Sequence, residues 1–280
     1  MKYKIKHSTT YSYADFVSLC QNQARLTPKT NRAQICHSSR IDIEPPANYL
    51  QEFTDYFDNK VTAFEIATQH KKLKVTMTSE VELLLSANIN LVDTDMPWQE
   101  ARDIVAKPNT YQLLKTSEFI LPSQYTPFVQ GIKEYALTSF LADISLICGC
   151  KDLMARIFHE FQYDPGFTTI STPLSVVFAQ KRGVCQDFAH FAIACLRSIG
   201  LAARYVSGYI ETMPPEGEEK LAGADATHAW FSVFVPRFGW VDFDPTNNVM
   251  PNEQHITLAV GRDFSDVTPL KGVVFGGGTQ

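Results

Sequence analysis

The sequence has no long apolar run and no excess of positive charge, and each of these gaps excludes a class of function. No stretch approaches the roughly 18 consecutive apolar residues that a membrane span requires. The first residues, MKYKIKHSTTYSY, include basic side chains but lack the apolar run that follows them in a secretory signal. The net charge is −5 over 280 residues, whereas nucleic-acid binding relies on clustered Lys and Arg. We therefore expect a cytoplasmic protein whose partner is neither nucleic acid nor a membrane.

Cysteine spacings typical of disulfide frameworks and zinc sites are also missing. The sequence has no acidic loop with the spacing of an EF-hand either. We therefore expect no cofactor and no metal, and a reducing compartment. With 45% hydrophobic and 20% charged residues, the chain has the composition of an ordinary folded protein. The six cysteines are Cys20, Cys36, Cys148, Cys150, Cys185 and Cys195.

Patterning along the chain predicts three regions. Polar and apolar residues alternate in runs such as LKVTMTSEVELLL, which indicates a β-rich N-terminal domain over residues 1–95. Apolar positions three and four apart predict a helical connector over residues 96–150. Residues 151–280 combine a helix with three later strand-like runs, so this region is predicted to be an α+β domain.

Cys185 lies where a helix is expected to begin, in the stretch GVCQDFAHFAIACLRSIG. Apolar residues recur there at helical spacing, the helix starts near Gln186, and Gly200 is placed to end it. A thiol at a helix N-terminus meets the positive end of the helix dipole, which favours the nucleophilic thiolate. A cysteine can also be simply a small buried apolar residue, so this position alone does not define a site.

Two later strands supply the partners that such a nucleophile needs. His228 begins HAWFSVFVP, and Asp244 follows sixteen positions later in GWVDFDPTNN. Side chains opposed on an antiparallel pair lie about 5 Å apart, so a His–Asp contact is expected. Nucleophile, base and orienting acid are the groups that covalent acyl transfer requires. Asp242 shares a strand face with Asp244, so spacing alone leaves both open as the acid.

The stretches RGVCQDFAHFAIACLRSIGLAARYVSGYIE, DATHAWFSVFVP and GWVDFDPTNN together resemble the core of bacterial transglutaminase-like proteins. HSTTYSY, ARLTP and DYFDNKV resemble the β domain that precedes that core, and HITLAVGRDFSDVTPLKG resembles its tail. The resemblance implies a papain-like fold in which the helix bearing the nucleophile packs on an antiparallel sheet. It implies catalytic roles for Cys185, His228 and Asp244, and the family's Asp-Pro-Thr ending favours Asp244 over Asp242.

Two departures from the family pattern concern the oxyanion donor and the end of the chain. Animal transglutaminases have a tryptophan upstream of the cysteine, but none of the three tryptophans here lies just before Cys185. We expect the Cys185 N–H to act with a second donor, either Gln180 or Tyr163. The sequence ends at GGGTQ, where relatives usually continue into one more strand.

The resulting hypothesis is a cysteine protease or amidase that acts on a protein or peptide through a thioester. One scaffold can also host transfer to an amine, which would give a cross-linking acyltransferase. A third hypothesis is a catalytically idle binding module. We expect Asp187 to stabilise its helix, and His190 and His255 to be structural. The sequence does not indicate the natural substrate or the oligomeric state.

Overall fold

The computed structural model describes residues 1–84, 96–211, 226–251 and 253–278. The chain divides into two compact units, which are described separately below. The first unit comprises residues 1–87, 256–260 and 267–280, and the second comprises residues 88–255 and 261–266.

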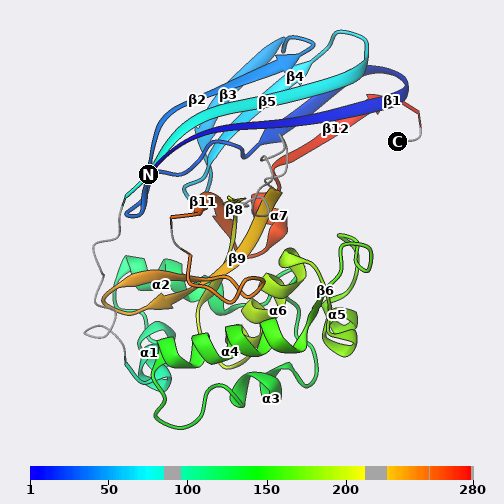
Figure 1. Ribbon diagram of the computed structural model, residues 1–280. Helices are drawn as coiled ribbons and strands as arrows, with labels where there is room; N and C mark the ends of the chain where they lie inside the picture. The colour runs from blue at the N-terminus through cyan, green and yellow to red at the C-terminus, as the bar shows by residue number, and fades with distance from the viewer. Residues whose placement is uncertain (85–95, 212–225, 252, 279–280) are drawn as a thin grey trace, which may run out of the picture. The chain divides into compact units, whose positions relative to one another are not determined.

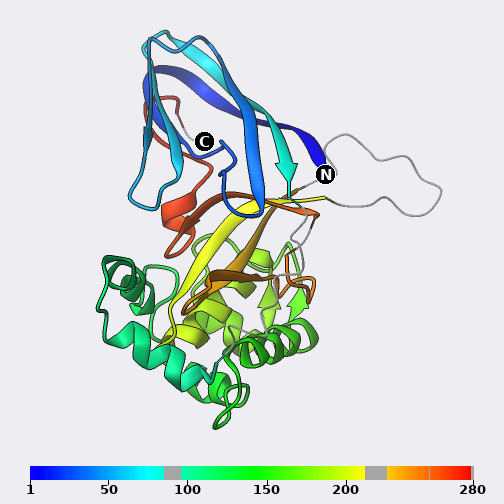
Figure 2. The same cartoon turned by 90° about the vertical axis from the view of Figure 1, so that its left-hand side faces the viewer.

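The first unit is a six-stranded antiparallel sheet (Figures 1 and 2). Five strands run in the order β2-β5-β1-β4-β3, and β12 also pairs with the long β1. Alternation of exposed and half-buried side chains along β1 matches the period-two sequence pattern. A core that includes Val17, Phe64 and Val75 lies on one face of the sheet. The strands are β1 (Lys2–Ala24), β2 (Gln34–Glu44), β3 (Tyr49–Thr54), β4 (Lys60–Ile66), β5 (His70–Leu83) and β12 (Leu270–Gly276).

The second unit contains the helices and a second sheet, in the order β10-β9-β8-β11, although residues 256–260 of β11 are counted with the first unit. The helix α6 packs against β9 and β8 of this sheet, as Figure 1 shows. Its helices are α1 (Trp98–Ala106), α2 (Tyr111–Ser117), the 3₁₀ turn η2 (Glu118–Ile120), α3 (Ile132–Leu137), α4 (Leu146–Glu160), α5 (Leu174–Gln180), α6 (Cys185–Ser198) and α7 (Phe264–Val267). Its strands are β6 (Gln162–Tyr163), β7 (Arg182–Gly183), β8 (Ala203–Ile210), β9 (Ala226–Val235), β10 (Gly239–Phe243) and β11 (His255–Gly261).

The predicted fold class is confirmed: a strand-rich N-terminal region precedes an α+β core in which a helix packs on an antiparallel sheet. The helix that bears Cys185 ends near the expected glycine, because Gly200 adopts a φ of +85° that L side chains rarely take. None of the helices in the described ranges is both long and apolar enough to cross a membrane.

The division of the chain differs from the expected domains in two respects. The helices of the expected connector, 96–150, belong to the second unit, and residues 256–260 and 267–280 belong to the first. Residues 267–280 belong to the first unit because β12 completes the N-terminal sheet, where Cys20 pairs with Val274 and Ala24 with Leu270. The expected boundary at residue 95 lies outside the described residues.

Candidate active site

Cys185 is the first residue of α6, and the residues around it hold that helix end in place. Asp187 Oδ2 accepts a hydrogen bond from the Val184 N–H at 2.9 Å, and the Thr168 hydroxyl donates to the same oxygen at 2.6 Å. A carboxylate at this position satisfies a backbone donor that the helix itself cannot satisfy. Burial raises the pKa of the Asp187 carboxyl, and these two hydrogen bonds oppose that shift without reversing it. Asp187 therefore has the helix-stabilising placement expected of it, and Cys185 is left half-buried at the helix tip as a free thiol.

The segment that leads into the helix is fixed by a short parallel pairing between β6 and β7. In this pairing β6 aligns Tyr163 with Gly183, and the Asp164 N–H donates to the Gly183 carbonyl at 2.8 Å. Arg182 forms an ion pair with Asp164, and Lys181 forms another with Glu160. The chain therefore enters α6 along a defined path, so that the position of the sulfur is set by backbone pairing.

His228 and Asp244 lie on the sheet that α6 covers. His228 is on β9, and Asp244 directly follows β10, the strand that pairs with β9. His228 Nε2 lies 2.8 Å from Asp244 Oδ2, and both side chains are buried. The structure thus brings the predicted histidine and acid into direct contact, as the hairpin argument required.

Electrostatics favour a protonated ring at His228. Burial alone would lower the pKa of the imidazole, but the hydrogen bonds and charges of Asp244 and Cys185 raise it to about 9. Because Asp244 engages Nε2, Nδ1 is the ring nitrogen available to Cys185. The predicted histidine and acid are therefore hydrogen-bonded to each other, and Cys185 lies close enough to raise the pKa of His228.

Asp244 is fully buried, and hydrogen-bond donors surround its carboxylate. The backbone N–H groups of Thr246 and Asn247 donate to Oδ1, as in an Asx turn. The Asn247 side chain donates to Oδ2 at 2.7 Å. Burial opposes ionisation, yet the hydrogen bonds outweigh it and hold the pKa of Asp244 well below its usual range. The carboxylate is therefore charged and acts only as an acceptor.

His255, which we had expected to be only structural, provides a second imidazole that hydrogen-bonds to the Asp244 carboxylate. Its Nε2 lies 3.1 Å from Asp244 Oδ2. Sequence reasoning missed this contact because nothing in the spacing relates the start of β11 to the end of β10. Asn247 was also missed, although the turn sequence Asp-Pro-Thr-Asn carries a signal for it.

His228, Asp244 and His255 are the group, within the described parts of the chain, whose donor atoms could hold a metal ion. Those atoms lie within 4.8 Å of one another. Distances of 2.8 and 3.1 Å from the nitrogens to the carboxylate oxygen are those of hydrogen bonds, and each nitrogen must carry a proton to make one. A metal would have to displace both protons, so the observed arrangement fits proton chemistry better than metal binding.

The other predicted candidates lie apart from these residues. Asp242 accepts a hydrogen bond from Ser232, the residue paired with it on β9, and does not contact His228. His190 is buried beneath Tyr125, with the two rings stacked at 5.4 Å, and burial lowers the pKa of its imidazole to about 3. His190 is therefore placed as a structural residue.

Of the two candidate oxyanion donors, Tyr163 is the one whose hydroxyl pKa is changed by the charge of Cys185. Its ring packs edge-on against Phe188, one turn beyond Cys185, at 6.4 Å. Burial raises the pKa of its hydroxyl, and the charge of Cys185 raises it further. Gln180 is an exposed residue at the end of α5.

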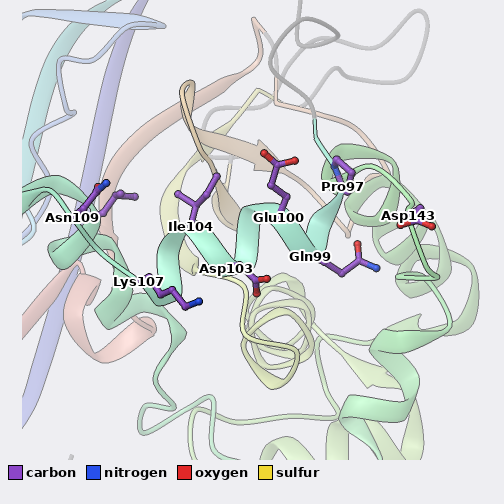
Figure 3. Close-up of a pocket in the computed structure, with 9 residues that line it drawn as sticks. Pro97, Gln99, Glu100, Asp103, Ile104, Lys107, Asn109 and Asp143 are labelled. Atoms are coloured by element: carbon purple, nitrogen blue, oxygen red, sulfur yellow. The ribbon is translucent and has the colours of Figure 1, made fainter.

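A hollow of about 930 Å³ opens beside the start of α6. Gln186 and Asp187, which directly follow Cys185, contribute to its wall, and exposed apolar side chains such as Phe128 and Ile170 line it. A second hollow, of about 680 Å³, lies along α1 and is lined by residues such as Glu100, Asp103 and Lys107, away from the site (Figure 3). Of these two hollows, the first is the one that borders the start of α6.

Comparison with known proteins extends this picture. The bacterial transglutaminase-like N-terminal region matches residues 3–82, and the transglutaminase-like superfamily core matches residues 139–245. An uncharacterised protein of Mycobacterium tuberculosis is 37% identical, in an alignment that covers 98% of this chain and 88% of that protein. A protein-glutamine gamma-glutamyltransferase of Pseudomonas aeruginosa is 30% identical over 121 residues, which is 40% of this chain and 18% of that enzyme.

The fold has a counterpart among solved structures. The crystal structure of a provisionally assigned cysteine protease from Cytophaga hutchinsonii superposes with a TM-score of 0.74. That likeness covers 98% of this chain and 86% of the other at 20% sequence identity. With both domain matches, the mycobacterial relative and the shared fold in agreement, the chain belongs to the bacterial branch of the transglutaminase-like superfamily.

Proposed function

We propose that the protein is a cysteine-dependent amidase or peptidase in which Cys185 is the nucleophile, His228 the general acid and base, and Asp244 the residue that orients the imidazole. The observation that carries the proposal is the buried hydrogen bond between His228 and Asp244, with Cys185 close enough to His228 to raise the pKa of its imidazole. A cysteine beside a basic imidazole, at a helix N-terminus, is the arrangement that activates a thiol nucleophile.

The reaction proceeds in two steps. In the first, the Cys185 sulfur bonds to the carbonyl carbon of an amide, and the carbon–nitrogen bond breaks as the His228 imidazolium gives its proton to the departing amine. In the second, His228 takes a proton from water, whose oxygen attacks the thioester, and the carboxylic acid and the free thiol result. The Cys185 N–H and the Tyr163 hydroxyl donate to the oxyanion in both steps.

The substrate of this reaction is proposed to be a protein or peptide. Support comes from the hollow beside α6, whose volume of about 930 Å³ and apolar walls suit peptide side chains. We also propose that the protein works in the cytoplasm, which the free thiols of Cys20, Cys36 and Cys148 support.

Transfer to an amine in place of water is the second candidate. The observation that favours it is the matched enzyme of Pseudomonas aeruginosa, which is named a protein-glutamine gamma-glutamyltransferase. The two outcomes share the thioester and differ only in what resolves it.

One experiment tests both outcomes. The purified protein is incubated with glutamine-containing peptides, with and without a fluorescent amine, and release of ammonia or peptide fragments is compared with incorporation of the amine. Hydrolysis without incorporation is expected. Cys185→Ala should abolish turnover, whereas Cys148→Ala, which removes an exposed thiol on α4, should leave it unchanged. Turnover that survives Cys185→Ala would exclude the proposed mechanism.

A further inference from the structure

The carboxylate that orients His228 is shared with a second histidine. Asp244 Oδ2 lies 2.8 Å from His228 Nε2 and 3.1 Å from His255 Nε2. The His255 side chain is 2% exposed, and its ring packs edge-on against Trp230 at 5.3 Å with an interplanar angle of 87°. Burial and this aromatic contact hold the second imidazole in one orientation.

The charge of the Asp244 carboxylate, which accepts both hydrogen bonds, determines where His228 and His255 carry their protons. Hydrogen bonds from His228 and His255 help keep Asp244 ionised against burial, so the carboxylate has no proton to give. Both imidazoles must therefore present an N–H at Nε2. Because its Nε2 carries the proton, neutral His228 keeps Nδ1 as the basic nitrogen, which is the tautomer that a base for Cys185 needs.

We propose that His255 is a positioning residue for this chemistry: its Nε2–H holds Asp244 in the orientation that directs the carboxylate at His228. This inference rests on the proposed function. A buried carboxylate needs donors from more than one side to keep its charge and its rotamer. His228 moves its proton during the reaction, whereas the Nε2–H of His255 is directed at the carboxylate, so it supplies a donor that stays constant through the cycle.

Two variants of His255 test the role of that single N–H. His255→Leu has a similar volume and no donor, and His255→Gln keeps a side-chain N–H near the position of Nε2. Hydrogen bonds to charged groups contribute about 1.5 to 3 kcal/mol, which corresponds to about 10- to 160-fold in rate. We expect kcat to fall by that factor in His255→Leu with KM changed less than about threefold, and His255→Gln to recover most of the loss.

The rate at which iodoacetamide alkylates Cys185 provides a readout that needs no substrate. It should slow in His255→Leu and recover in His255→Gln, while alkylation of Cys148 stays the same in both. Wild-type activity in His255→Leu, or equal losses in the two variants, would overturn the positioning role. A wild-type Cys185 that reacts no faster than Cys148, together with turnover in Cys185→Ala, would instead overturn the proposed function itself.

Discussion

The carboxylate of Asp187 lies directly over Gly183, so that a Cβ built at Gly183 would stand 2.6 Å from Asp187 Oδ2. The same oxygen accepts from the Val184 N–H. Gly183 and Asp187 therefore fit together at the point where α6, the helix that begins with Cys185, starts. The backbone conformation at Gly183 does not require glycine; the approach of the carboxylate does.

Gly183→Ala should push Asp187 off the helix end and shift Cys185. Forcing a methyl group into a filled site typically costs about 1 to 3 kcal/mol. We expect a loss of that size in the free energy of unfolding, measured in urea, and a fall in the alkylation rate of Cys185. Gly183→Ala/Asp187→Ala removes the carboxylate that would stand 2.6 Å from the new methyl group and leaves only Cβ of residue 187, at 2.8 Å, so the loss should be smaller than the sum of the two single losses. Additive losses would show that the two residues are not coupled.

The pH dependence should follow His228. Its pKa in the folded protein is about 9, against 6.5 for an unperturbed imidazole. A raised pKa contributes stability that is complete below about 6.5 and is lost as the pH rises through about 9. Turnover should decline over the same basic range, because the imidazolium is the group that protonates the leaving amine. Unfolding free energies and kcat measured from pH 6 to 10 check both expectations, and a kcat that keeps rising above pH 9 would contradict the assignment.

Asp244→Asn and Asp242→Asn form a matched pair, because the two residues lie two apart and only Asp244 contacts His228. An amide at 244 removes the charge that raises the pKa of His228 and can hold the ring in the wrong tautomer. The corresponding change in a serine protease lowers kcat about 10⁴-fold. We expect a large loss in Asp244→Asn, with the basic limb of the pH profile moved to lower pH, and little change in Asp242→Asn. Similar kcat values for the two variants would remove Asp244 from the mechanism.

Much of the site could be predicted from the sequence because its parts are set by local rules. A helix N-terminus positions Cys185, and one strand pairing brings His228 to Asp244. The contact between His255 and Asp244 depends instead on how β11 is placed in the sheet, and no local pattern encodes that placement. The pairing of β12 with β1 was missed for the same reason, since the two strands lie about 250 positions apart along the chain.

Tyr163 and Gln180 give the last test, which concerns the oxyanion. Tyr163 is 53% exposed, so its hydroxyl can meet a substrate, and its ring is fixed against Phe188. Removing an oxyanion donor lowers kcat about 100-fold or more with little effect on KM. Tyr163→Phe keeps the ring and removes only the hydroxyl, so we expect that loss without a change in melting temperature. Gln180→Met, the matched change at the other candidate, should leave kcat nearly unchanged. The reverse result would assign the donor to Gln180, because each substitution removes one hydrogen-bonding group and leaves the nucleophile and its histidine in place.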